Sequence, residues 1–163
     1  MDSASDSGSE GWRFESSRAR FKMTREFSAG GIVFNTSGQV LLICASAMKE
    51  PEKKHWGFPK GNVGEGESMK EAALREVREE SGVEAEITAK VGDSKYVYTR
   101  PCSGEKVFKV VSIFLMKYLS GDTKDHDWEV EDVGWFEPEE ALKTLSFSQD
   151  KLLLKKALEI YGQ

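Results

Sequence analysis

The segment from Ser68 to Ser81 constrains this chain most, because it carries helix signals at both of its ends. Ser68 and Glu71 form a capping-box sequence, in which each side chain can satisfy a free amide of the first turn. Gly82 follows directly, at a position where helices commonly stop. The sequence therefore predicts a helix over residues 68–81.

Three glutamates lie on one face of this expected helix. At about 100° per residue, Glu76, Glu79 and Glu80 fall within one arc of roughly 100°. Such pairs of like charges destabilise a helix by about 0.2–0.5 kcal/mol each, which a bound cation would reverse. Carboxylates clustered without His or Cys suit Mg²⁺ or Mn²⁺. We therefore predict a divalent-metal site, with a solvated acidic surface as the alternative.

A glycine-rich loop from Trp56 to Glu67 leads into the helix, and such a loop can bring backbone groups close to a metal or a phosphate. Residues Gly61 to Val83 read G-x5-E-x7-R-E-V-R-E-E-S-G-V. This pattern resembles the complete Nudix box, and it would arise by chance in fewer than about one chain in a million. The resemblance implies an α/β fold, namely an α/β/α sandwich around a mixed β-sheet.

The resemblance also implies roles for the residues of the box. Glu67 and Arg75 would orient the glutamates, and the bound metal would polarise the phosphates and activate a water molecule. The general base stays open, because family members place it either within the box or on a later loop. The implied metal ligands are Glu76, Glu79, Glu80 and the carbonyl group of Gly61.

A second acidic segment precedes the apolar residues 133–136. It resembles the family position that supplies a further metal-binding glutamate. We assign this role to Glu129, with Glu131 as the alternative and a solvated loop acid as the other interpretation of either residue. Both would share one face of an extended strand, so the sequence does not choose between them.

Four residues outside the box are candidate substrate contacts. Lys60 precedes the box and can partner a phosphate. Tyr96 and Tyr98 alternate onto one face of an expected strand, where two rings could sandwich a base. Lys109 is a charge inside an apolar strand, which indicates either a phosphate partner or a lysine on an edge strand. Ordinary packing or solvation is the alternative for all four.

Three segments, residues 56–61, 96–98 and 128–135, are similar to bacterial-type diadenosine tetraphosphate hydrolases of the Nudix family. This resemblance implies asymmetric cleavage of diadenosine tetraphosphate to ATP and AMP. Nucleotide sugars, oxidised nucleoside triphosphates and inositol pyrophosphates are alternative substrates, because relatives with the same box act on them. A nucleotide-binding module with an idle active site is a further alternative, which the complete set of box glutamates disfavours.

The remaining pattern predicts strands and helices interspersed around one sheet. Residues 28–34 and 39–44 predict a β-hairpin with its turn at residues 35–38. Further strands are expected near residues 84–98, 106–118 and 133–136, and further helices over residues 138–145 and 148–161.

With 163 residues, the chain fits one domain, which we place at residues 21–163 after a flexible tail at residues 1–20. The net charge of −5 argues against nonspecific binding to nucleic acid and leaves a small nucleotide as the expected partner. Residues 1–10 lack the apolar core of a secretory signal, and no apolar stretch approaches the roughly 20 residues of a membrane span. We therefore expect a cytoplasmic protein. Cys44 and Cys102 are predicted to be reduced, structural thiols.

Overall fold

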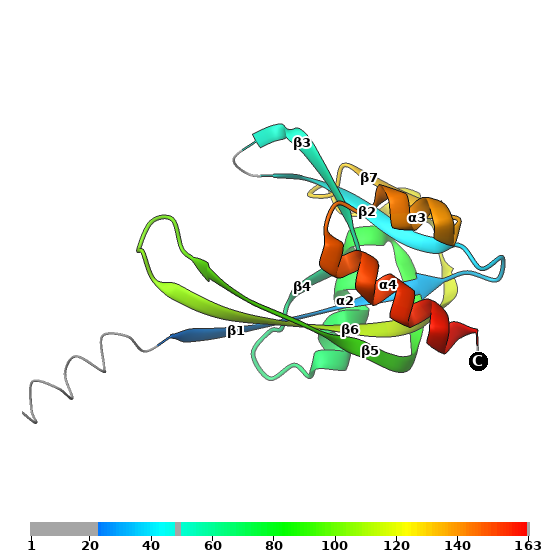
Figure 1. The fold of residues 1–163 in the computed structure, drawn as a ribbon. Helices are drawn as coiled ribbons and strands as arrows, with labels where there is room; N and C mark the ends of the chain where they lie inside the picture. Colours follow the sequence, from blue (N-terminus) through cyan, green and yellow to red (C-terminus); the bar gives the residue numbers. More distant parts are fainter. Residues whose placement is uncertain (1–22, 48–49, 163) are drawn as a thin grey trace, which may run out of the picture.

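The computed structural model describes residues 23–47 and 50–162 (Figure 1). The tail predicted at residues 1–20 lies outside this range. The strands are β1 (Thr24–Phe34), β2 (Val40–Ala47), β3 (Glu50–Gly57), β4 (Lys60–Asn62), β5 (Val83–Thr99), β6 (Lys106–Gly121) and β7 (Asp132–Phe136). The helices are α2 (Met69–Ser81), α3 (Pro138–Thr144) and α4 (Ser148–Tyr161), with a short 3-10 helix η1 (Thr123–Asp125).

The strands form one mixed sheet with the order β3-β2-β1-β6-β5, while β4 pairs with β1 and β7 pairs with β2. Strands β1 and β6 are parallel, and the other pairs are antiparallel. Helix α2 covers one face of the sheet, and α3 and α4 cover the other (Figure 1). The α/β/α sandwich implied by the sequence is thereby confirmed.

Each face of the sheet has its own hydrophobic core, because successive residues of a strand point to opposite faces. In β1, Ile32 packs with Leu154 of α4, whereas its neighbour Val33 packs with Val77 of α2. All four side chains are fully buried. Helix α2 is therefore held against the sheet by its apolar side, and its glutamates lie beside the sheet.

Three features of the sheet differ from the sequence prediction. Strand β4 was not predicted, because it lies within the segment that was expected to be a glycine-rich loop. Strand β3 was not predicted, because its residues Glu52, Lys53 and Lys54 are exposed and show no apolar alternation. It extends the sheet beyond β2 as an edge strand. Strand β1 begins at Thr24, four residues before the predicted start, because its first residues pair with β6.

The predicted structural role holds for one of the two cysteines. Both thiols are free, but Cys44 is buried in β2 while Cys102 is exposed in the turn between β5 and β6. The structural role predicted for Cys102 is therefore wrong. None of the helices in the described ranges is long and apolar enough to span a lipid bilayer.

Candidate metal and nucleotide site

Helix α2 begins and ends as its sequence predicts. The Ser68 hydroxyl accepts a hydrogen bond from the Glu71 amide at 3.1 Å, and the Glu71 carboxylate accepts one from the Ser68 amide at 3.2 Å. Gly82 ends the helix with a φ of 76°, and its amide donates to the Arg78 carbonyl at 2.8 Å. These local contacts fix where the helix begins and ends. They therefore place Glu76, Glu79 and Glu80 in its last two turns.

Arg75 lies at the centre of the acidic cluster. Its guanidinium donates to Glu67 and Glu76 at 2.8 Å each and to Glu79 at 3.1 Å. It also donates to the Asn62 carbonyl at 2.9 Å, which ties the helix to β4. The hydrogen bond from Arg75 lowers the pKa of Glu67. Arg75 and Glu67 are thus placed to orient Glu76 and Glu79.

The Glu76 carboxylate lies directly over the backbone of Gly61. Its side chain is only 13% exposed, and burial raises its pKa even though Arg75 opposes that shift. A Cβ atom at position 61 would lie 2.2 Å from the Glu76 carboxyl carbon. The glycine therefore lets the β4 backbone and the carboxylate approach each other closely.

Glu80 is the most perturbed carboxylate of the cluster. Its pKa is raised to about 8, chiefly by burial and to a lesser extent by the nearby charges of Glu76 and Glu129, while the hydrogen bond from the Lys60 amide opposes the shift. The Lys60 amide donates to the Glu80 carboxylate at 2.9 Å. Glu80 takes part in none of the ion pairs seen among the described residues.

The donor chemistry of this cluster fits a divalent cation. As the side chains stand, no three His, Cys, Asp or Glu residues in the described ranges converge closely enough to hold a metal ion. Arg75 engages Glu76 and Glu79, and the Lys60 amide engages Glu80. However, a hard cation between partly buried carboxylates would offset the cost of their burial, and their oxygen atoms are the ligands that Mg²⁺ and Mn²⁺ prefer.

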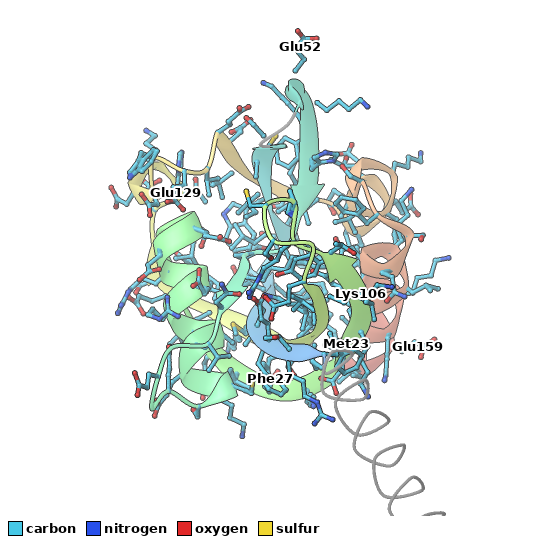
Figure 2. The ribbon with its side chains drawn as sticks, turned by 90° about the vertical axis from the view of Figure 1, so that its left-hand side faces the viewer. Met23, Phe27, Glu52, Lys106, Glu129 and Glu159 are labelled. Atoms are coloured by element: carbon cyan, nitrogen blue, oxygen red, sulfur yellow. The ribbon has the colours of Figure 1, made fainter. Side chains whose placement is uncertain are left out.

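The structure separates the two candidate glutamates of the later acidic segment. The expected shared strand face is wrong, because β7 begins only at Asp132 and a turn precedes it. The Glu131 carboxylate lies 3.6 Å from the ammonium group of Lys54 on β3. Glu129 lies beside the end of α2 (Figure 2), close enough for its charge to raise the pKa of Glu80.

Two of the four candidate substrate residues line a groove. Lys60, Tyr96, Phe147 and Asp150 surround a hollow of about 400 Å³. A second hollow of about 210 Å³ shares three of these residues and reaches Glu80. The two hollows together form one groove, which runs from the ring of Tyr96 to Glu80.

The other two candidates form hydrogen bonds to Glu26. The Tyr98 hydroxyl donates to Glu26 at 2.8 Å, and its ring centroid lies 6.3 Å from that of Tyr96 at a 45° tilt. The two rings contact each other and leave no slot for a base between them. Lys109 is buried in β6, where its ammonium donates to Asn62 at 2.5 Å and to Glu26 at 3.3 Å. Because β6 lies between β1 and β5, the edge-strand interpretation of Lys109 is wrong.

Asp150 and Phe147 were not predicted from the sequence to belong to the site. Asp150 is only 6% exposed in the first turn of α4, and burial raises its pKa. An acid in the first turn of a helix is common, so no local pattern marked it as buried. Only the packing of α4 against the sheet places Asp150 in the groove.

This architecture defines a protein of the α/β/α sandwich class with a loop–helix–loop that carries clustered carboxylates. A family model described as NUDIX domain matches residues 24–156. The chain belongs to the Nudix family.

The chain is also similar to individual proteins and to solved structures. The chain is 30% identical over 146 residues to the Mycobacterium tuberculosis protein named MutT4, a match that covers 86% of this chain and 58% of that protein. It is 28% identical over 130 residues to the asymmetrical bis(5′-nucleosyl)-tetraphosphatase of Caenorhabditis elegans, covering 79% of this chain and 91% of the relative. A crystal structure of a C. elegans Ap4A hydrolase binary complex superposes with a TM-score of 0.63 at 25% identity, covering 84% and 98% of the two chains.

Proposed function

We propose that this chain hydrolyses a phosphoanhydride bond in a nucleoside diphosphate-linked substrate with the help of Mg²⁺ or Mn²⁺. The observation that carries the proposal is the pair formed by Glu76 and Glu80. Both carboxylates are partly buried, both have raised pKa values, and Glu80 has no ion-pair partner among the described residues. Such a pair is stabilised by a cation that is shared with substrate phosphates.

The chain's own residues prepare this chemistry. Glu76, Glu79, Glu80 and Glu129 are the proposed metal-binding side chains, together with the Gly61 carbonyl. Arg75 holds Glu76 and Glu79 in place, and Glu67 in turn fixes Arg75. A divalent metal at this site supplies a polarised phosphate, a more acidic water molecule and countercharge for the transition state.

Diadenosine tetraphosphate, cleaved asymmetrically to ATP and AMP, is the substrate that we propose. The groove beside Glu80 offers Lys60 to a phosphate and the rings of Tyr96 and Phe147 to a base. The match to the tetraphosphatase of C. elegans, which extends over 91% of that relative, supports this choice. The net charge of −5 supports a small nucleotide over nucleic acid as the ligand, and we propose a cytoplasmic location for the reaction.

The test is a substrate panel in the presence of Mg²⁺, with the products separated by chromatography. We expect diadenosine tetraphosphate to give ATP and AMP, and we expect chelator or Glu79→Gln to abolish turnover. Glu86→Gln, on an exposed residue of β5, is the matched control. Turnover that survives both chelator and Glu79→Gln contradicts the mechanism.

The same panel distinguishes the alternative functions. The proposed hydrolase activity would stand, with a different substrate, if the protein prefers to cleave a nucleotide sugar, an oxidised nucleoside triphosphate or an inositol pyrophosphate. Binding without turnover of any panel member would favour the idle nucleotide-binding module. Metal-stimulated turnover of any pyrophosphate excludes that module.

A further inference from the structure

Trp128 has the most exposed large apolar side chain in the described part of the protein. It is 87% exposed, compared with 63% for Leu152, the next in order. The two other tryptophans of the described ranges are packed: Trp56 contacts Phe136 at 5.2 Å between ring centroids, and Trp135 contacts Tyr118 at 5.6 Å. An indole ring normally contributes to stability through burial, so this exposure calls for a reason outside the fold.

The backbone on both sides of Trp128 is anchored. The Asp127 amide donates to the Glu79 carbonyl at 2.8 Å, which attaches the segment to helix α2. Val130 is buried, and the Glu131 amide donates to the Cys44 carbonyl at 2.9 Å, which attaches the segment to β2. The indole ring therefore stands in solvent on a backbone that is held in position.

The segment that carries this ring lies beside the proposed metal site. The amide of Asp127, the chain neighbour of Trp128, donates to the backbone carbonyl of Glu79 at 2.8 Å, and the other neighbour, Glu129, lies beside the end of α2 (Figure 2). No other large apolar residue between positions 122 and 136 is exposed. A single ring between two acidic residues does not make an apolar protein-binding patch, whereas a flat aromatic base can stack on it.

We propose that Trp128 is a stacking platform for the second base of a two-base substrate. This inference rests on the proposed function. The first base would occupy the groove of Tyr96 and Phe147, which reaches Glu80 from the side of α4. Trp128 approaches the same cluster from the segment after η1, so a polyphosphate chain would lie between the two aromatic sites.

The test compares a two-base with a one-base substrate on the same protein. The values of kcat/KM are measured for diadenosine tetraphosphate and for adenosine tetraphosphate with Mg²⁺, using wild type, Trp128→Ala and Trp128→Phe. We divide kcat/KM for diadenosine tetraphosphate by kcat/KM for adenosine tetraphosphate. Trp128→Ala should lower this ratio about tenfold, because it removes one base stack. The change should appear as a higher KM for the two-base substrate. Trp128→Phe keeps a ring and should restore most of the ratio.

Two matched variants sharpen the comparison. Leu119→Ala shortens another exposed apolar side chain, which is 57% exposed on β6, and should leave both substrates unaffected. Phe147→Ala acts on the first base and should impair both substrates alike. An unchanged ratio for Trp128→Ala would overturn the inference.

Failure of the proposed function would look different, because the wild type would then turn over neither substrate. In that case, calorimetric titration of wild type and Trp128→Ala with diadenosine tetraphosphate still tests the platform. Weaker binding by Trp128→Ala supports the platform, and equal affinity of the two proteins overturns it.

Discussion

The Glu76 carboxylate occupies the space that a side chain at Gly61 would need. A Cβ atom on Gly61 would lie 2.2 Å from the carboxyl carbon of Glu76 and 2.3 and 2.4 Å from its two oxygen atoms. These distances are far below van der Waals contact. The glycine at the start of the box is therefore required by the position of a proposed metal ligand.

Gly61→Ala should displace Glu76 and leave the protein folded. A misplacement of about 1 Å at a reacting centre can lower the rate about 100-fold, so we expect a loss of kcat/KM of that size. Gly92→Ala is the control, because its Cβ would meet only ordinary contacts at 3.5 Å or more. Metal-stimulated activity in Gly61→Ala equal to that of Gly92→Ala would show that the close approach is not needed.

Glu80→Gln should separate activity from stability. Burial raises the pKa of Glu80 from 4.5 to about 8, so the folded protein without metal loses stability as the pH rises through this window. The amide has no such cost, and we expect Glu80→Gln to have a higher Tm than wild type at pH 8 in chelator, while metal-stimulated turnover is lost. Glu86→Gln should change neither quantity. A lower Tm for Glu80→Gln would mean that the buried charge is already compensated.

Glu129 and Glu131 should differ in their effect on catalysis. Glu129 lies near Glu80, whereas Glu131 faces Lys54 on β3. We expect Glu129→Gln to lower metal-stimulated activity about tenfold, and more at low Mg²⁺ concentration, because groups around a metal site typically contribute at least this much. Glu131→Gln should stay close to wild type, since exposed ion pairs contribute little. The reverse order would assign the metal role to Glu131.

Glu26 anchors a charged network on the strands beside the site. Hydrogen bonds from Tyr98 and Arg100, together with the ammonium group of Lys109, lower the pKa of Glu26 from 4.5 to about 2. Because the pKa of Glu26 is lower in the folded protein than in the unfolded chain, the carboxylate stabilises the fold at pH values above its unfolded pKa of about 4.5. This stabilisation is lost as the pH falls from about 4.5 to about 2. The network should therefore support the fold at neutral pH and fail in acid.

Tyr98→Phe tests this dependence. At pH 7 it should lower the free energy of unfolding by about 1 kcal/mol, because it removes a hydrogen bond to a carboxylate. The difference from wild type should shrink as the pH falls toward and below 2, because Glu26 then becomes protonated in both folded proteins. Urea unfolding at pH 7 and in acid gives both values. Tyr96→Phe is the matched control, and a pH-independent difference would remove Glu26 from the explanation.

Sequence reasoning succeeded where the interactions are local. The capping box of Ser68 and Glu71 and the stop at Gly82 lie within one short segment, and the helix forms as predicted. The shared face of Glu76, Glu79 and Glu80 follows from helix geometry alone. Strand β3 could not be predicted in this way. It forms by pairing with β2, and its sequence carries exposed charges in place of an apolar pattern.

The order of amino acids alone was enough to predict the box helix, its carboxylates and the family, because these depend on one continuous segment, residues 61–83. The tertiary structure decided that Glu129 and not Glu131 lies near Glu80, that Lys109 pairs with Glu26 and that Asp150 is buried in the groove. Lys109 and Glu26 are 83 residues apart in the chain. Contacts of this kind form only when strands and helices pack together, so they cannot be predicted from a local sequence pattern.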